Sequence, residues 1–422
     1  MKKKIFLIAC ISALAAIFLL PFVQRSMGKT DFIREVLAKN DGFAAEGSGT
    51  TGGAAAVEDN IFRVTNRQEF IAALGNRKTT EPRILMIYGT IDFDTDADGK
   101  HLTMEDYMAE GYDFQQYLES HAPHSTAPQS RKEEQEEKIK QSQKNQEKNI
   151  MVHVPANTSI IGIEHAKLKG VDLVLDADNM IIRNIMFESP YDYFPSWDPN
   201  DGPDGSWNSQ YDSVTIRGGT HIWIDHCHFE DAQQPTETYF HREYEHRDGL
   251  VDIVNQADDI TMSYNVFERH NKAILIGSSD AKTADDGKLN VTLHHNYFHN
   301  LVQRAPRVRF GKVHVYNNYY QADEDNGGYR YAYSLGVGKN SKIYAENNVA
   351  DIDGRTYQDF VKVFGGTELT TLNNIFNGEK IDTFNEHLSP VMWTPERSMQ
   401  IDDVNEVKSK VLQQAGVLKN ED

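Results

Sequence analysis

Four cationic side chains lie within ten residues of one another in the segment from Gln303 to Lys312. Arg307 and Arg309 alternate with Val308 and Phe310, which is the period-two pattern of a half-buried strand. Both guanidinium groups are therefore expected on one face of that strand, with the apolar pair facing inward. Guanidinium groups held on a strand suit a carboxylate or phosphate ligand, so the segment predicts a site for an anionic substrate.

The charge of the whole chain argues that this cationic segment has a specific use. The sequence has 43 basic and 63 acidic residues and a formal charge of −20. Such a chain repels nucleic acid and anionic membranes, so neither is an expected partner. The simpler alternative is an ordinary solvated charged strand, as is common for surface arginines.

Three aspartates precede the cationic segment and could hold a metal ion. Asp212 lies in one strand-like region, and Asp248 and Asp252 flank Leu250-Val251 in the next. Carboxylates from successive strands would form an oxygen-only site, which suits Ca²⁺. The alternative is that they cap corners or are solvated. Lys272 follows one repeat later and, taken alone, is as readily explained by solvent exposure.

A repeated strand pattern after residue 151 would position these side chains. Alternating apolar strands each end in Asn, once His, followed by another apolar pair. The markers of the pattern, which recur at intervals of 22 to 42 residues, are Asn184, His226, Asn265, Asn296, Asn318, Asn348 and Asn374. Irregular repeats of this kind predict a parallel β-solenoid with loops on one side and Asn at its corners. A β-propeller would keep a steadier period, and a βαβ protein would need helical patterns between the strands.

Other segments predict the ends and insertions of the solenoid. Asn66 begins a short helix with Phe70, Ile71 and Leu74 on one side. A polar excursion with a solvated helix is expected at 92–149, and an amphipathic helix covering the last coil at 404–417. The expected division is a signal peptide at 1–27, an extended segment at 28–60, a single catalytic domain at 61–396 and a helical tail at 397–422.

The N-terminus predicts secretion. Three lysines precede the apolar run from Ile5 to Leu20, as in an export signal, with a retained anchor as the alternative. Only Cys10 and Cys227 are present, so the mature chain would form no internal disulfide. Cys227 lies in an apolar strand pattern and is expected in the core.

Several of these segments together resemble the extracellular pectate lyases of polysaccharide lyase family 1. They are Thr220-His221-Ile222-Trp223-Ile224-Asp225-His226-Cys227, Asp248-Gly249-Leu250-Val251-Asp252-Ile253, the region from Ile260 to Lys272, and Gln303 to Gly311. The resemblance implies an all-β, right-handed parallel β-helix with an N-terminal capping helix and a C-terminal helix. It also implies a monomer that binds homogalacturonan and cleaves it by Ca²⁺-assisted β-elimination.

The resemblance also implies roles for individual residues. Asp212, Asp248 and Asp252 would hold calcium, Arg304 would be the general base, and Lys272 and Arg309 would bind uronate carboxylates. Arg307 matches no catalytic position of the family and is expected to line the cleft or pair with an aspartate. Gln210 stands where some relatives have another acid. Because arginine ordinarily keeps its proton, a role as base predicts an alkaline optimum.

Other interpretations stay open at this stage. A pectin lyase would act on methyl-esterified polymer without calcium, but the three aspartates argue against it. A solenoid glycoside hydrolase would need a pair of acids flanking the scissile bond. A non-catalytic β-helix would bind polysaccharide only. His270, His294, His295 and His299 could suggest a transition metal, but packing and hydrogen bonding explain them better.

Overall fold

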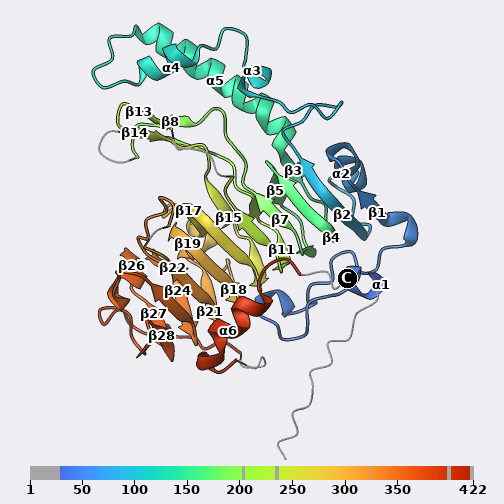
Figure 1. Cartoon of the computed structure of the whole chain (residues 1–422), viewed down its shortest axis with the longest axis vertical. Coiled ribbons are helices and arrows are strands. Elements are labelled where there is room, and N and C mark those ends of the chain that lie inside the picture. The colour runs from blue at the N-terminus through green and yellow to red at the C-terminus, as the bar shows by residue number, and fades with distance from the viewer. Residues whose placement is uncertain (1–28, 202–204, 233–236, 325, 397–400, 419–422) are drawn as a thin grey trace, which may run out of the picture.

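The computed structural model describes residues 29–201, 205–232, 237–324, 326–396 and 401–418. The predicted signal peptide and Cys10 lie outside the described residues. Within these ranges, no helix combines the length and apolar character needed to cross a membrane. The chain winds into successive coils whose strands stack in parallel, as Figure 1 shows. This confirms the parallel β-helix expected from the sequence repeats.

Three stacks of parallel strands form the faces of the β-helix. The first stack pairs each strand with its equivalent in the next coil. Its strands, in stacking order, are β1 (Ile61–Val64), β2 (Arg83–Asp92), β4 (Thr158–Lys169), β6 (Met180–Arg183), β11 (Thr220–Asp225), β16 (Asp258–Ser263), β18 (Val291–His294), β21 (Lys312–Tyr316), β24 (Lys342–Glu346) and β27 (Leu369–Leu372).

The second stack begins with the later halves of β2 and β4 and runs alongside the first. It continues through β7 (Met186–Glu188), β12 (His228–Glu230), β17 (Val266–Ile276), β19 (Tyr297–Gln303), β22 (Tyr319–Ala322), β25 (Val349–Ile352) and β28 (Asn374–Phe376). Aromatic rings from this stack face inward and stack on one another, with centroids 4.7 to 5.2 Å apart from Phe187 to Tyr320. The strand β29 (Glu379–Ile381) closes the stack antiparallel to β28.

The third stack carries the candidate site. It contains β3 (Met151–His153), β5 (Asp172–Leu175), β10 (Val214–Arg217), β15 (Gly249–Val254), the later half of β17, β20 (Arg307–Val308), β23 (Leu335–Gly338) and β26 (Val361–Phe364). Inward apolar residues of all three stacks merge in one core, in which Cys227 is buried as predicted.

The expected asparagine corner consists of two adjacent rows rather than one. Side chains of the inner row hydrogen-bond from coil to coil at 3.0 to 3.1 Å through Asn265, Asn296, Asn318, Asn348 and Asn374. The left-handed backbone occurs one residue earlier, at Asn184, His226, Tyr264, His295, Asn317, Asn347 and Asn373, with φ between 49° and 61°. The sequence-based row was therefore wrong at Asn184 and His226, because Cys227 is the residue that meets Asn265.

The helices lie outside the β-helix. α1 (Lys29–Ile33) and the turns η1 (Phe43–Ala45) and η2 (Glu58–Asn60) belong to an N-terminal arm across the outer face of the first stack, where Ala44 N donates to Thr261 Oγ1 at 3.1 Å. α2 (Arg67–Leu74) begins at Asn66 as expected and buries Phe70 and Leu74, but Ile71 is exposed. The remaining short turns are η3 (Thr283–Asp285) and η4 (Tyr357–Phe360).

The C-terminal helix α6 (Val404–Gln414) lies on the flank of the β-helix rather than over its last coil. It is amphipathic as expected, and it buries Val404, Val407 and Val411 against Tyr319 and Val349. These two residues begin β22 and β25, which belong to inner coils.

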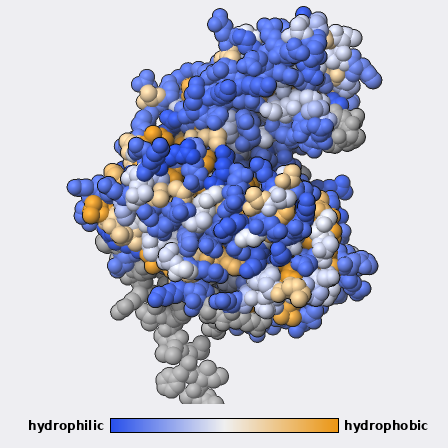
Figure 2. Space-filling view, turned by 180° about the vertical axis from the view of Figure 1, so that it is seen from behind, coloured by the Kyte–Doolittle hydropathy of each residue, from blue (hydrophilic) through white to orange (hydrophobic). Residues whose placement is uncertain are grey.

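The excursion between β2 and β3 is more than a solvated helix. It contains α3 (Met104–Tyr107), α4 (Phe114–Ser120) and the 22-residue α5 (Gln129–Ile150), which rise above the coils in Figure 1. Figure 2 shows that its outer surface is almost wholly hydrophilic on that side. The inner face of α5 is buried, and Gln143 and Gln146 donate to the backbone oxygens of Phe194 and Tyr191 at 2.7 Å each.

The face of α5 that lies against the coils thereby fixes the loop that leads to Asp212. The loop contains a small sheet of β8 (Ser196–Asp198) and β9 (Ser206–Asn208), joined by β13 (Glu237–Tyr239) and β14 (Arg242–Tyr244) from the next loop. The hydroxyl of Tyr211, the residue directly before Asp212, donates a hydrogen bond to the backbone oxygen of Gln143 at 3.2 Å. The excursion therefore supports the loop that positions Asp212.

Candidate functional site

The three predicted metal ligands lie on neighbouring coils of the third stack. Asp212 precedes β10, Asp248 precedes β15, and Asp252 lies within β15. Asp212 Oδ1 accepts a hydrogen bond from Gly249 N at 2.8 Å. A methyl group added at Gly249 would lie 2.7 Å from Asp212 Oδ1 and 2.8 Å from Asp252 Oδ1. Two carboxylates thus converge over a residue that has no side chain.

Burial and the charges of neighbouring acids together raise the pKa values of these two carboxylates. Burial, with the charges of Asp252, Asp248 and Asp172, raises the pKa of Asp212 well above its usual value. Burial and the charge of Asp248 also raise the pKa of Asp252 to about 7, although Arg304 and Lys272 oppose the shift. Converging, poorly solvated carboxylates are costly unless a cation joins them, and an all-oxygen donor set fits a hard divalent ion such as Ca²⁺.

A fourth carboxylate, Asp172, belongs to this cluster and was missed in the sequence. It begins β5, the stack neighbour of β10, and is 1% exposed. Thr215 Oγ1 lies 2.9 Å from Asp172 Oδ1 and 3.2 Å from Asp212 Oδ2, so one hydroxyl links the two acids. Aligning the repeat one coil earlier would have placed Asp172 beside Asp212.

Gln210, where some relatives have an acid, is exposed, and its amide donates to the Tyr211 hydroxyl at 3.0 Å. Its backbone N donates to the buried Asp192 at 3.2 Å. Burial raises the pKa of Asp192 to about 7, and a second backbone bond from Phe194, at 2.8 Å, supports the same carboxylate. Asp192 thus anchors the loop that carries Asp212.

Lys272 lies beside the carboxylates because β17 pairs with β15, where Lys272 is the partner of Gly249. Its Nζ atom is 2.6 Å from Glu245 Oε2 and 3.2 Å from Asp248 Oδ1. Burial alone would lower the pKa of Lys272, but Asp248 and Glu245 outweigh burial and raise it. Lys272 is therefore a cation of the site, not a solvated side chain, and Glu245 is a partner that the sequence did not reveal.

The cationic strand is the next step along the third stack. β20 contains only Arg307 and Val308, but the alternation extends further because Val308 and Phe310 are both buried. Arg307 lies on the side of the strand that faces away from the core, and its guanidinium carbon lies 4.1 Å from the centre of the Phe364 ring. Arg309 Nε donates to Asp280 Oδ1 at 2.8 Å, and its NH1 donates to the Gly277 oxygen at 2.9 Å.

Arg304 joins the carboxylates to the rest of the cationic strand. It has a φ of 64°, a left-handed conformation that is uncommon outside glycine and often occurs at functional sites. Its charge opposes the rise in the pKa of Asp252 that burial causes, and it adds to burial and to Arg309 in lowering the pKa of Arg307. Burial raises the pKa of Tyr333, while the charge of Arg304 opposes the shift.

The seven predicted site residues therefore form one continuous group along four neighbouring strands, β10, β15, β17 and β20. With strands about 4.8 Å apart, the group spans roughly 15 Å. One end is acidic and the other cationic. Such an arrangement can hold a divalent ion beside an acidic sugar and place additional positive charge on the same substrate.

The histidines that raised the question of a transition metal have other partners. His270 bridges Asp231 and the Asp248 backbone oxygen at 2.7 Å each, so it helps to hold a predicted ligand in place. The other three have carboxylate partners: His294 with Asp41, His295 with Asp402, and His299 with Glu268 and Asp323. In the described ranges one triad has metal-ligand spacing, His228, Glu230 and Glu268, but Arg269 already pairs with both glutamates.

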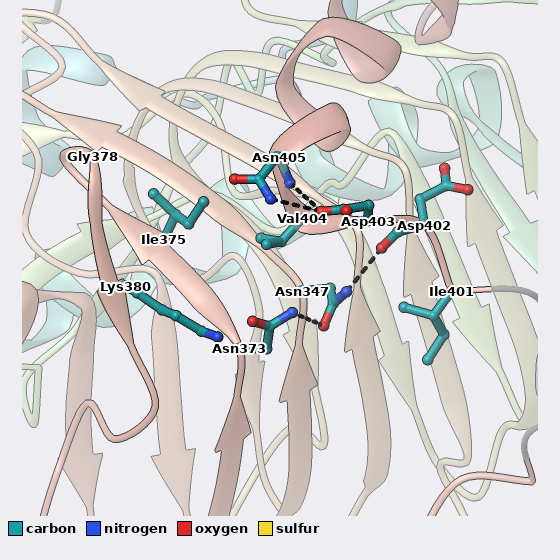
Figure 3. A pocket seen from close by; sticks show the side chains of 10 residues that line it. All are labelled: Asn347, Asn373, Ile375, Gly378, Lys380, Ile401, Asp402, Asp403, Val404 and Asn405. Carbon is teal, nitrogen blue, oxygen red and sulfur yellow. Dashed lines mark hydrogen bonds between the residues drawn. The ribbon is translucent and has the colours of Figure 1, made fainter. Parts of the chain in front are cut away.

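A separate hollow of about 600 Å³ lies where the C-terminal segment meets the last coils (Figure 3). Asn347 Nδ2 donates to the Asp402 backbone oxygen at 2.8 Å, and Asn373 Nδ2 donates to Asn347 Oδ1 at 3.0 Å. The Asp402 carboxylate pairs with His295 and Lys410. The polar groups of this hollow thus fasten the C-terminal segment to the row of left-handed corners.

Comparisons with known proteins identify a family to which this chain is similar. A family model described as pectate lyase matches residues 128–420. A pectate lyase of Bacillus subtilis is 46% identical over 413 residues, which cover 96% of this chain and 98% of that protein. Pectate lyase A of Dickeya chrysanthemi is 32% identical, covering 81% and 78% of the two chains.

Solved structures give the same result. A structure titled as a pectate lyase bound to hexasaccharide has a TM-score of 0.88 and 47% identity, covering 92% of this chain and 99% of that one. A pectate lyase from Acidovorax avenae subsp citrulli has a TM-score of 0.82 at 29% identity, covering 91% of this chain and 95% of that one.

Proposed function

Since this chain belongs to the pectate lyase family and is a polysaccharide lyase acting on polygalacturonate, we propose that it cleaves the polymer by Ca²⁺-dependent β-elimination with Arg304 as general base. The observation that carries the proposal is the continuous group of converging carboxylates and cations on the third stack. In this proposal the carboxylates, through calcium, and the cationic side chains act on the same acidic sugar chain. The products are oligogalacturonides with a 4,5-unsaturated end.

Asp212, Asp248 and Asp252 are the residues that would hold calcium. Asp212 and Asp252 converge over Gly249, and burial together with neighbouring carboxylates raises their pKa values. Asp172 supports this set through Thr215. A bound Ca²⁺ would draw electron density from the uronate carboxylate and so make the neighbouring C5 proton more acidic.

Arg304 takes the proton from C5 in this mechanism. The C5–H electrons form the C4–C5 double bond, the C4–O bond breaks, and the leaving oxygen takes a proton from solvent. The position of Arg304, between the carboxylates and the other arginines, supports this assignment. It must be neutral to accept the proton, and guanidinium groups ordinarily remain protonated, so the rate is expected to rise toward alkaline pH.

Lys272 and Arg309 would bind uronate carboxylates and stabilise the negative charge that grows on them during elimination. Asp280, the partner of Arg309, has a side chain that is 62% exposed and is free to turn into solvent when substrate arrives. Arg307 rests on Phe364, and we assign it to the wall of the substrate cleft. The few cations attract an acidic polymer locally although the chain is acidic overall.

The same proposal includes secretion, which the apolar N-terminal run supports and which suits a polymeric substrate. The experiment that tests the function follows the ultraviolet absorbance of the unsaturated product on polygalacturonate and on highly methylated pectin, from pH 6 to 11. We expect product on polygalacturonate with an alkaline optimum. Product formed only on methylated pectin would instead indicate a pectin lyase, and absence of product on both would indicate a binding protein.

A further inference from the structure

The ammonium group of Lys272 is shared between two carboxylates of this chain. Glu245 Oε2 lies 2.6 Å from Lys272 Nζ, and Asp248 Oδ1 lies 3.2 Å away. The lysine and Glu245 side chains are only 15% and 11% exposed, whereas that of Asp248 is 31% exposed. Glu245 directly follows β14 and has no part in the reaction described above.

The two carboxylates have different consequences for a substrate at Lys272. Asp248 is a proposed calcium ligand, so its charge would be shared with the ion, and Glu245 remains as the partner that neutralises Lys272. A uronate carboxylate that binds the same ammonium group must then lie close to Glu245. Two anions on one cation in a poorly solvated site repel each other.

Glu245 cannot move away as easily as the acid that pairs with Arg309. Asp280 has a 62% exposed side chain on a loop, so water can solvate it once it is displaced. Glu245 is enclosed, and moving it from Lys272 would leave a buried carboxylate without its partner. The Lys272 position is therefore less favourable for a free acid than the Arg309 position.

We propose that Glu245 is a specificity-determining residue, which neutralises Lys272 and lets this subsite accept methyl-esterified galacturonate as well as the free acid. A methyl ester carries no charge and meets no repulsion from Glu245, while its carbonyl oxygen can still accept a hydrogen bond from Lys272. The ligand class is partly methyl-esterified pectin. The inference rests on the proposed role of Lys272 in binding substrate.

The test compares wild type with Glu245→Gln, which keeps an acceptor for Lys272 but removes the charge. Both enzymes are assayed at saturating Ca²⁺ on polygalacturonate and on half-esterified pectin at pH 8.5. Burial raises the pKa of Glu245 to about 7, so the wild-type carboxylate is ionised under these conditions. The expected result is a rise of about 5- to 20-fold in the ratio of kcat/KM for polygalacturonate to that for pectin.

The change should come mainly from a lower KM on polygalacturonate, and it should shrink at high ionic strength. Glu243→Gln is the matched control, since Glu243 is exposed two residues away and its loss should leave the ratio unchanged. An unchanged ratio in Glu245→Gln, or a higher KM on polygalacturonate, would overturn the proposal and make Glu245 a residue that merely positions Lys272.

Lys272→Met separates this proposal from the function on which it rests. If Lys272→Met raises KM on polygalacturonate while Glu245→Gln changes nothing, only the specificity role fails. If Lys272→Met leaves KM unchanged, the role of Lys272 in binding substrate fails, and the role of Glu245 fails with it. Thermal unfolding of each variant verifies that the fold is intact.

Discussion

Replacing Gly249 by alanine should weaken calcium binding without removing any proposed ligand. The added Cβ would lie 2.7 Å from Asp212 Oδ1 and 2.8 Å from Asp252 Oδ1, whereas real Cβ contacts essentially never fall below 3.0 Å. Both carboxylates must therefore move by several tenths of an ångström. Gly249 N also donates to Asp212, so the backbone resists a compensating shift.

The size of the effect follows from the precision that a metal site requires. Ligand distances need to stay within about 0.2 Å of their preferred values, and disturbing the groups that orient ligands typically costs about 10- to 100-fold in affinity. We expect a loss in that range, which corresponds to about 1.4 to 2.7 kcal/mol of binding free energy. Because all three aspartates remain, activity should largely recover at high Ca²⁺.

Titration calorimetry with Ca²⁺ measures this directly on wild type and Gly249→Ala. Gly354→Ala is the control for calcium affinity: its φ of 64° strains an alanine locally, but no atom lies within 4 Å of the added Cβ, and the residue follows β25 of the second stack rather than a strand of the site. Thermal unfolding in EGTA should show that Gly249→Ala retains the fold. Wild-type calcium affinity in Gly249→Ala would refute the assignment of the ion to the space between Asp212 and Asp252.

Three further predictions concern the base, the fold and its pH dependence. Arg304→Lys should lower kcat on polygalacturonate by about 10²- to 10⁴-fold with a smaller change in KM, and near-full activity at every pH would argue against Arg304 as base. Asn318→Ala should lower the free energy of unfolding by about 3 to 5 kcal/mol, because it leaves the buried hydrogen-bond partners of Asn318 in the inner asparagine row unsatisfied. Asn340→Ala, at a less buried corner, should lower it by under about 1 kcal/mol, and urea unfolding measures both. Burial lowers the pKa of His295 to about 4, so the unfolded state binds more protons between about pH 4 and 6.5, and stability should fall as the pH is lowered through that window. His295→Asn should remove up to about 3 kcal/mol of this dependence, and an unchanged pH profile of unfolding would contradict it.

The sequence predicted the coils, and it predicted which side chains of Asp252 and Arg307 face outward, because both depend on local alternation, whereas the roles of the site residues were implied by the family resemblance and stay a prediction. The apolar neighbours of Asp252 and Arg307 must face the core, so the side chains of Asp252 and Arg307 face away from it. Stacking of equivalent strands then brings such outward side chains together. The same reasoning could not choose between adjacent asparagines such as Asn317 and Asn318. Asn317 adopts the left-handed backbone and Asn318 forms the coil-to-coil hydrogen bonds, and both roles favour asparagine.

Residues whose roles depend on loops were not predictable in this way. Glu245 meets Lys272 because the loop after β14 folds back against β17, and no periodic pattern connects the two residues. Helix α5 lacks an apolar stripe because Gln143 and Gln146 use amide groups to hold loop carbonyls. Hydrophobic periodicity therefore indicated a solvated helix where the structure has a polar contact surface. Asp172 has a regular place in the stack, but it lies before the first repeat that the sequence pattern identified.

The most direct test of the proposed site is the calcium dependence of the elimination itself. The initial rate of ultraviolet product formation on polygalacturonate is measured in EGTA and then after Ca²⁺ is restored, for wild type and for Asp252→Asn. The account predicts no product in EGTA, full recovery of the wild type with Ca²⁺, and a much higher Ca²⁺ requirement in Asp252→Asn. A full rate in EGTA, or a wild-type Ca²⁺ requirement in Asp252→Asn, would contradict it.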